Sequence, residues 1–120
     1  MEEIKSIIKE PNHYAMYFYE KNTMEFIGSY SIYKNYLYNL HIETLKRRNG
    51  YGSELVKHAM REKKELFLDV DPDNKIAKKC YEKCGFKLER KLFNYHHPCW
   101  GEKVPPASEI ERYFWREIVE

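Results

Sequence analysis

The sequence predicts an α/β protein built on one mixed β-sheet. Three observations support this fold class: aromatic and β-branched segments with short polar turns fill the first half of the chain, two helical patterns follow, and a short apolar strand lies between them. The chain has 120 residues, of which 42% are hydrophobic and 33% are charged. That length and composition predict a single globular domain over residues 1–120.

The first half of the chain predicts an antiparallel meander. Strands are expected over residues 13–20, 25–33 and 36–45, because these segments are rich in tyrosine, phenylalanine and isoleucine. The links, KNTM at 21–24 and Lys34–Asn35, are short and polar, as tight turns require. Alternation along the third strand should place four residues on one face, namely Tyr36, Tyr38, Leu40 and Ile42. His41 and Glu43 should lie on the other face.

The second half predicts alternating helices and strands. A helix over residues 50–64 carries one apolar stripe, formed by Tyr51, Leu55, Val56, Ala59 and Met60. An apolar strand over 65–70 is typical of a strand buried between two layers. A second helix over 74–84 should stop at Gly85 and bury Ile76, Ala77, Cys80, Tyr81 and Cys84. Strands over 86–93 and 110–119, separated by a long irregular loop, should form a C-terminal β-hairpin.

Charge, cysteines and hydropathy exclude several classes of protein. The net charge of +2 argues against a generic nucleic-acid binder, because such proteins usually carry a clear basic excess. The N-terminus has no apolar run of signal-peptide length, and no segment approaches the roughly 18 apolar residues of a membrane span. The three cysteines lack the spacing of a disulfide framework. We therefore expect a cytoplasmic protein that does not act at a membrane.

The segment LKRRNGYGSELVKHAM, residues 45–60, places two of the chain's five glycines at a helix start beside two arginines. Amide groups at a helix start are unpaired and carry partial positive charge. Glycines let the backbone approach a ligand closely, and the arginines add full positive charge. The pattern predicts a phosphate or pyrophosphate site, the alternative being a glycine-rich turn with solvated arginines.

Two motifs in this chain resemble those of the GNAT superfamily of N-acetyltransferases. The loop reads R-x-x-G-x-G, with Arg47, Gly50 and Gly52, and resembles that family's acetyl-CoA-binding loop. Downstream, LDVDPDNKIAKKCYEKCGF resembles the second signature, L-x-V-x-x-x-N-x-x-A-x-x-x-Y-x-x-x-G-F. Its matching residues are Leu68, Val70, Asn74, Ala77, Tyr81, Gly85 and Phe86. The resemblance covers residues 14–93 and extends to the last strand.

The resemblance implies the GNAT fold, with splayed central strands and two main helices, and acetyl-CoA as the acyl donor. The Arg47 side chain is expected beside the pyrophosphate of CoA. The pyrophosphate itself is expected on the main-chain amides of six residues, namely Arg48, Asn49, Gly50, Tyr51, Gly52 and Ser53. The pantetheine arm is expected to pair with main-chain groups near Ile42 and Thr44. An amide near Ile42 or Glu43 is expected to stabilise the oxyanion as the amine attacks the thioester.

Two side chains of the second signature are implied in the site. Asn74 is expected to contact the pantetheine side of the cofactor, or else only to cap its helix. Tyr81 is expected to protonate the departing CoA thiolate, the alternative being a tyrosine packed in the core.

The general base is not fixed by the motifs. The positions comparable to the bases of relatives are Tyr36 and Tyr38, and a phenol with its ordinary pKa of about 10 is a poor base at neutral pH. We expect Glu43 to be the catalytic base, with His41, Glu25 or a water chain as alternatives. The other interpretation of Glu43 is a solvated carboxylate.

The sequence departs from the family before its first predicted strand. GNAT enzymes generally have one or two helices between their first two strands, and the twelve residues before His13 are too few to hold them. The acceptor cleft is therefore expected to be either open or completed by another subunit, which makes a homodimer one expected form.

The segment NYHHPCW, residues 94–100, raises the question of a metal. His96, His97 and Cys99 are close in sequence, and Cys80 and Cys84 are four residues apart on a helix. This spacing does not match a zinc motif such as C-x2-C, so no metal site is expected. The histidines are expected to be exposed loop residues or to act at the acceptor site, which this loop borders in the family.

The predicted function is acetyl transfer from acetyl-CoA to a primary amine, either a small molecule or a protein amine. The alternative from another class is a catalytically inactive acyl-CoA-binding regulatory module, which the unassigned base and the short N-terminus favour. A nucleic-acid-associated module is a third possibility, which predicts salt-sensitive binding to RNA or DNA.

Overall fold

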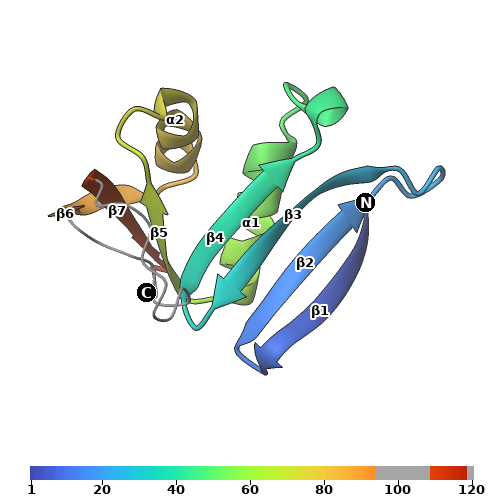
Figure 1. Ribbon diagram of the computed structural model, residues 1–120, viewed down its shortest axis with the longest axis horizontal. Coiled ribbons are helices and arrows are strands. Elements are labelled where there is room, and N and C mark those ends of the chain that lie inside the picture. The colour runs from blue at the N-terminus through green and yellow to red at the C-terminus, as the bar shows by residue number, and fades with distance from the viewer. Residues whose placement is uncertain (94–108, 119–120) are drawn as a thin grey trace.

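The computed structural model describes residues 1–93 and 109–118. Within them, seven strands form one mixed sheet in the order β1-β2-β3-β4-β5-β7-β6, and two α-helices pack against it (Figure 1). The strands are β1 Glu2–Glu10, β2 His13–Tyr19, β3 Phe26–Tyr33, β4 Tyr36–Ile42, β5 Glu65–Val70, β6 Lys87–Phe93 and β7 Glu109–Arg116. The helices are α1 Tyr51–Glu62 and α2 Lys75–Lys83, with a short 3-10 turn over Thr44–Lys46. The predicted meander, helices and mixed sheet are confirmed.

The N-terminal strand β1 was not predicted. It pairs antiparallel with β2, from Glu2 opposite Tyr19 to Ile7 opposite Tyr14. Its isoleucines stand at positions 4, 7 and 8, without the alternation of a half-buried strand, and all three are exposed. β1 ends at Glu10 and β2 begins at His13, so no helix lies between them, as the sequence predicted.

A β-bulge in β4 changes which residues share a face. The register with β3 shifts between the pairs Ser31–Tyr38 and Ser29–His41, and Asn39 there has a φ of 51°. Because a bulge reverses the alternation, Leu37 lies in the core before it, and Leu40 and Ile42 pack on the core after it. The prediction that Tyr36 and Tyr38 share a face with Leu40 and Ile42 was therefore wrong. Instead, the two tyrosines share the opposite face with His41 and Glu43.

Both helices lie on the same face of the sheet, and Figure 1 shows α1 behind β3 and β4. The predicted apolar stripe of α1 is confirmed, since Leu55, Val56 and Ala59 are buried. α2 is fixed to β7, where Lys78 pairs with Glu111 at 2.6 Å and the Tyr113 hydroxyl donates to Glu82 at 3.2 Å. In the described part of the chain, no helix is long and apolar enough to cross a membrane.

The burial predicted for α2 is correct in part. Ala77, Cys80, Tyr81 and Cys84 are partly buried. Ile76 is 85% exposed, so its predicted burial was wrong. It occupies the first turn of α2, next to Ala77, and lies at the margin of the apolar stripe that the other four residues form.

The two central strands diverge. β4 and β5 run parallel and pair only at Tyr36–Phe67 and Leu37–Leu68, at the start of β4. Beyond Leu37 the strands separate toward the start of α1, as the predicted splay requires (Figure 1). In the described part of the chain, main-chain groups on the β5-facing side of β4 beyond Leu37 therefore lack the sheet partner that they would have between two paired strands.

Gly28 on β3 accommodates the close passage of β4. A Cβ atom at this position would lie 2.3 Å from the main-chain oxygen of His41. We expect Gly28→Ala to lower the free energy of unfolding by about 1–3 kcal/mol, because the clash is with backbone that cannot rotate away. Urea unfolding measures this. Gly52→Ala is the control, because the one described atom that its Cβ would meet is Cys80 Sγ, at 3.9 Å. An unchanged midpoint for Gly28→Ala would show that β4 does not pass this close.

Candidate functional site

The start of α1 presents main-chain amides toward the gap between β4 and β5. Gly50 is its N-cap, with a left-handed φ of 80°, and its carbonyl accepts from the Glu54 amide at 3.2 Å. Gly50 has no side chain that could accept a hydrogen bond from the amides of the first turn, and no side-chain cap bond is made there within the described residues. The amides of Gly52 and Ser53 therefore point out of the helix end, where they and the helix dipole favour an anion.

Among the described residues, nothing packs on Gly52 so closely that a glycine is required there. Its φ is not left-handed, and an added Cβ would make only an ordinary contact with Cys80 Sγ at 3.9 Å. The neighbouring Ser53 hydroxyl lies 3.5 Å from the same sulfur, so the start of α1 meets the middle of α2 here. Because the fold itself accepts a side chain at position 52, the glycine points to a ligand that needs the space.

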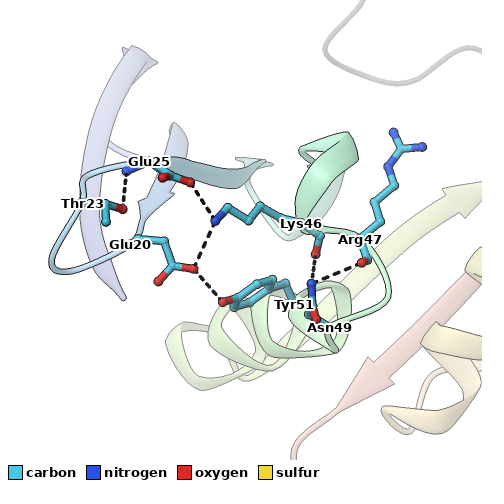
Figure 2. Close-up of polar contacts among 7 residues, drawn as sticks. All are labelled: Glu20, Thr23, Glu25, Lys46, Arg47, Asn49 and Tyr51. Carbon is cyan, nitrogen blue, oxygen red and sulfur yellow. Dashed lines mark hydrogen bonds and ion pairs between the residues drawn. The ribbon is translucent and has the colours of Figure 1, made fainter.

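The loop before α1 is held by its own side chains (Figure 2). Asn49 Nδ2 donates to the carbonyls of Lys46 and Arg47 at 3.1 and 3.3 Å. The Tyr51 hydroxyl donates to Glu20 at 2.8 Å, and Lys46 pairs with Glu25 at 3.0 Å. The hydrogen bond with Glu20 raises the pKa of Tyr51, and the hydrogen bond with Glu25 raises the pKa of Lys46. Asn49 and Tyr51 therefore fix the loop with their side chains, which leaves their main-chain groups for a ligand.

The two arginines of the loop differ in their contacts. Arg47 is exposed and its Nε donates to the Ile42 carbonyl at 3.1 Å, so its guanidinium lies beside the end of β4. Arg48 is also exposed, with a φ of 66° that is uncommon for a residue with a side chain. Two left-handed residues, Arg48 and Gly50, thus bend the loop around the start of α1.

We expect Arg47→Ala to weaken CoA binding by about 1–2 kcal/mol, because one charge-assisted contact to a phosphate is lost. Isothermal titration with CoA and with dephospho-CoA measures the loss. An equal loss for both ligands places Arg47 at the pyrophosphate, and a loss for CoA alone places it at the 3′-phosphate. Unchanged affinity for both would contradict any phosphate contact.

The amides of β4 that face the gap can be identified from the hydrogen bonds. The Glu43 amide donates to Ile27 of β3 at 2.8 Å, so Glu43 cannot supply a main-chain N–H to an oxyanion. Adjacent strand residues direct their amides to opposite sides, so the Ile42 amide faces the gap, and Leu40 faces the same way. Of the two expected donors, Ile42 is retained, and Leu40 is a donor that the sequence did not indicate.

Asn74 and Tyr81 lie on α2, across the gap. Asn74 Oδ1 accepts from the Ala77 amide at 3.1 Å, so it caps the helix, and its Nδ2 is the group left for a cofactor. Tyr81 is partly buried, and burial raises its pKa to about 12. In the described part of the chain its hydroxyl makes no hydrogen bond, while its ring lies near Phe86 with centroids 6.3 Å apart. A protonated phenol without a protein partner suits a proton donor to a ligand.

The expected base Glu43 lies at the end of β4. Its carboxylate is 3.6 Å from His41 Nε2, and both side chains are about half exposed. The alternative Glu25 is paired with Lys46. The bulge brings Glu43 and His41 to the face that also carries Tyr36 and Tyr38.

His96, His97 and Cys99 lie outside the described residues. Within the described ranges, no group of three or more histidine, cysteine, aspartate or glutamate side chains could hold a metal ion. Cys80 and Cys84 are free thiols that are partly buried on α2. Burial raises the pKa of Cys84, so its thiol is in the protonated form at neutral pH.

The family model for the acetyltransferase (GNAT) family matches residues 1–86. The chain belongs to the GNAT acetyltransferase family. Enzymes of this family use acetyl-CoA as the acyl donor. The matched segment contains the loop motif and the second signature up to Phe86, so the two motifs singled out in the sequence lie within it.

Curated relatives share the central part of the chain. Human N-alpha-acetyltransferase 30 is 35% identical over 68 residues, which cover 52% of this chain and 19% of that protein. The Xenopus laevis protein of the same name is 34% identical over 68 residues and is covered to 25%. The chain thus spans a quarter or less of the length of these relatives.

Solved structures confirm the fold. A Bacillus subtilis acetyltransferase in complex with CoA has a TM-score of 0.71 at 14% identity, covering 89% of this chain and 78% of that chain. Spermidine N-acetyltransferase from Vibrio cholerae, in complex with CoA and spermine, has a TM-score of 0.72 at 15% identity, covering 89% and 67%. At these identities the likeness establishes the GNAT fold.

Proposed function

We propose that residues 1–120 form a single N-acetyltransferase domain that transfers an acetyl group from acetyl-CoA to a primary amine. The observation that carries the proposal is the splay of β4 and β5 in front of the glycine-lined start of α1. The helix start offers an anion site, and the splay offers unpaired strand groups for an extended arm. A pyrophosphate followed by an arm with two amides, as in CoA, matches both features.

The donor is bound by main-chain groups. The pyrophosphate sits on the amides from Arg48 to Ser53, with the Arg47 guanidinium at its side. The pantetheine arm pairs with the end of β4 near Ile42 and with Thr44, the first residue of the 3-10 turn that follows. The Asn74 amide faces it from α2. The thioester carbonyl accepts from the Ile42 or Leu40 amide, which stabilises the oxyanion when the amine attacks.

The amine attacks the thioester carbon, and the tetrahedral intermediate then expels the CoA thiolate. Tyr81 protonates this thiolate, since a phenol with a raised pKa remains protonated at neutral pH. Glu43 is the base that takes a proton from the ammonium form of the acceptor before attack, because only a neutral amine can attack the thioester. Its half-exposed position beside His41 lets a proton leave to solvent.

The acceptor class to test first is a peptide N-terminus. The curated relatives are named N-alpha-acetyltransferases, and one structural neighbour contains spermine. These names favour an α-amine or a polyamine over other primary amines. The acceptor approaches from the face opposite the helices, because α1 and α2 cover the other face.

A screen with free-thiol readout tests the proposal. Purified chain and acetyl-CoA are incubated with peptides bearing free N-termini, with the same peptides N-terminally blocked, and with spermidine. Amine-dependent thiol release is expected, and blocked peptides should give none. Acetyl-CoA binding without thiol release on any amine would instead indicate an inactive acyl-CoA-binding module. No acetyl-CoA binding at all would contradict both functions.

A further inference from the structure

His13, at the start of β2, is a buried histidine with an unexplained atom. It is 3% exposed, and its Nε2 lies 2.6 Å from the Tyr38 hydroxyl on β4. Its Nδ1 is buried and has no hydrogen-bond partner among the described residues. Leaving such a group unsatisfied destabilises the folded state, so its retention calls for an explanation.

Tyr38 occupies a particular place in the splay. The last β4–β5 pair is Leu37–Leu68, so Tyr38 is the first β4 residue after the strands part. It stands at the closed end of the gap, while the start of α1 stands at the open end. An arm that enters beside α1 and runs along β4 carries its thioester toward the closed end. Leu40, whose amide faces the gap, is only two residues from Tyr38.

The orientation of Tyr38 is fixed by its neighbours. Its ring lies on the face opposite the helices, the side from which the acceptor approaches. His13 lies on the same face, with ring centroids 6.0 Å from Tyr38 and 5.0 Å edge-on from Tyr33. The aromatic contact and the 2.6 Å bond together hold the phenol in one position.

We propose that Tyr38 receives the proton of the attacking amine and that His13 is the positioning residue through which Tyr38 acts. The inference rests on the proposed acetyl transfer. It assigns a proton acceptor to the closed end of the gap, whereas Glu43 follows the other end of β4. A short hydrogen bond to a neutral imidazole makes a phenol oxygen a better acceptor than it is alone.

With the His13 proton on Nδ1, Nε2 accepts from the Tyr38 hydroxyl. As the neutral amine forms its C–N bond, the carbonyl electron pair moves to oxygen, the amine proton passes to Tyr38, and the Tyr38 proton passes to His13 Nε2. When the C–S bond breaks, the thiolate takes a proton from Tyr81. Solvent then returns one proton to Tyr81 and removes one from His13.

Steady-state kinetics of Tyr38→Phe, His13→Gln and the double variant test the inference. His13→Gln retains a hydrogen-bonding group but cannot take a proton. Each single variant should lower kcat by about 100-fold, with KM for acetyl-CoA and its thermal shift unchanged. The double variant should be no slower than the slower single variant, because both residues serve one step.

Tyr33→Phe is the matched control, since it keeps the ring that packs edge-on against His13, removes only its hydroxyl, and should keep wild-type kcat. If wild-type protein turns over amines and Tyr38→Phe keeps its kcat, the inference is wrong while the proposed function stands. Losses that multiply in the double variant would also overturn it. If wild-type protein releases no thiol, the proposed function itself fails. Tyr38→Phe keeps the ring, so it decides the matter even if His13→Gln does not fold.

Discussion

Replacing Tyr81 with phenylalanine should lower kcat by about 100-fold and leave acetyl-CoA affinity and melting temperature nearly unchanged. The ring remains, so its packing near Phe86 is kept. The hydroxyl has no hydrogen bond in the described part of the chain, so the fold loses none. Burial raises its pKa to about 12, so wild-type Tyr81 stays protonated, and can donate, at any pH well below that value.

Tyr113→Phe is the control for Tyr81→Phe, and its expected result is the reverse. The Tyr113 hydroxyl is bonded to Glu82 at 3.2 Å in a buried position, so its loss should reduce the free energy of unfolding by about 1 kcal/mol with little change in kcat. Steady-state measurements of kcat and thermal melts on both variants separate a catalytic hydroxyl from a structural one. Wild-type kcat in folded Tyr81→Phe would remove Tyr81 from the mechanism.

Much of the fold follows from local patterns in the sequence. The strand predicted over 65–70 agrees with β5. Every second residue of it, namely Leu66, Leu68 and Val70, is buried. The bulge at Asn39 could not be predicted, since a single left-handed residue in an aromatic strand leaves no pattern in composition. β1 was missed for a related reason: it is an edge strand with exposed isoleucines, stabilised by pairing with β2 rather than by burial.

The candidate site was predictable where it consists of backbone. Arg47, Gly50 and Gly52 specify a helix start and its charge, which are local properties. The contact between His13 and Tyr38 joins residues 25 positions apart, and the sequence gives no sign of it. The face shared by Tyr38, His41 and Glu43 depends on the bulge, so it too required the three-dimensional structure.

Gly52→Ala should change stability and binding in opposite directions. Among the described residues its Cβ would meet only Cys80 Sγ, at 3.9 Å, and alanine is the better helix former. The free energy of unfolding of the unliganded protein should therefore rise by about 0.5–1 kcal/mol. Acetyl-CoA should bind less tightly, because the methyl group stands where the pyrophosphate approaches the amides. Urea unfolding and titration of the same preparation measure both changes.

Gly52→Glu is the stronger form of this test and should abolish the rise in melting temperature that acetyl-CoA gives by binding the folded state. A carboxylate in the first turn of α1 favours the helix dipole, so the unliganded protein should stay folded and at least as stable. The same carboxylate repels the pyrophosphate and fills its place. Gly50→Glu would also strain the backbone, because Gly50 has a φ of 80° that residues with a side chain rarely adopt. A lost acetyl-CoA shift in that variant could therefore come from the strain as well as from the charge. A normal acetyl-CoA shift in folded Gly52→Glu would show that the pyrophosphate does not bind at the start of α1.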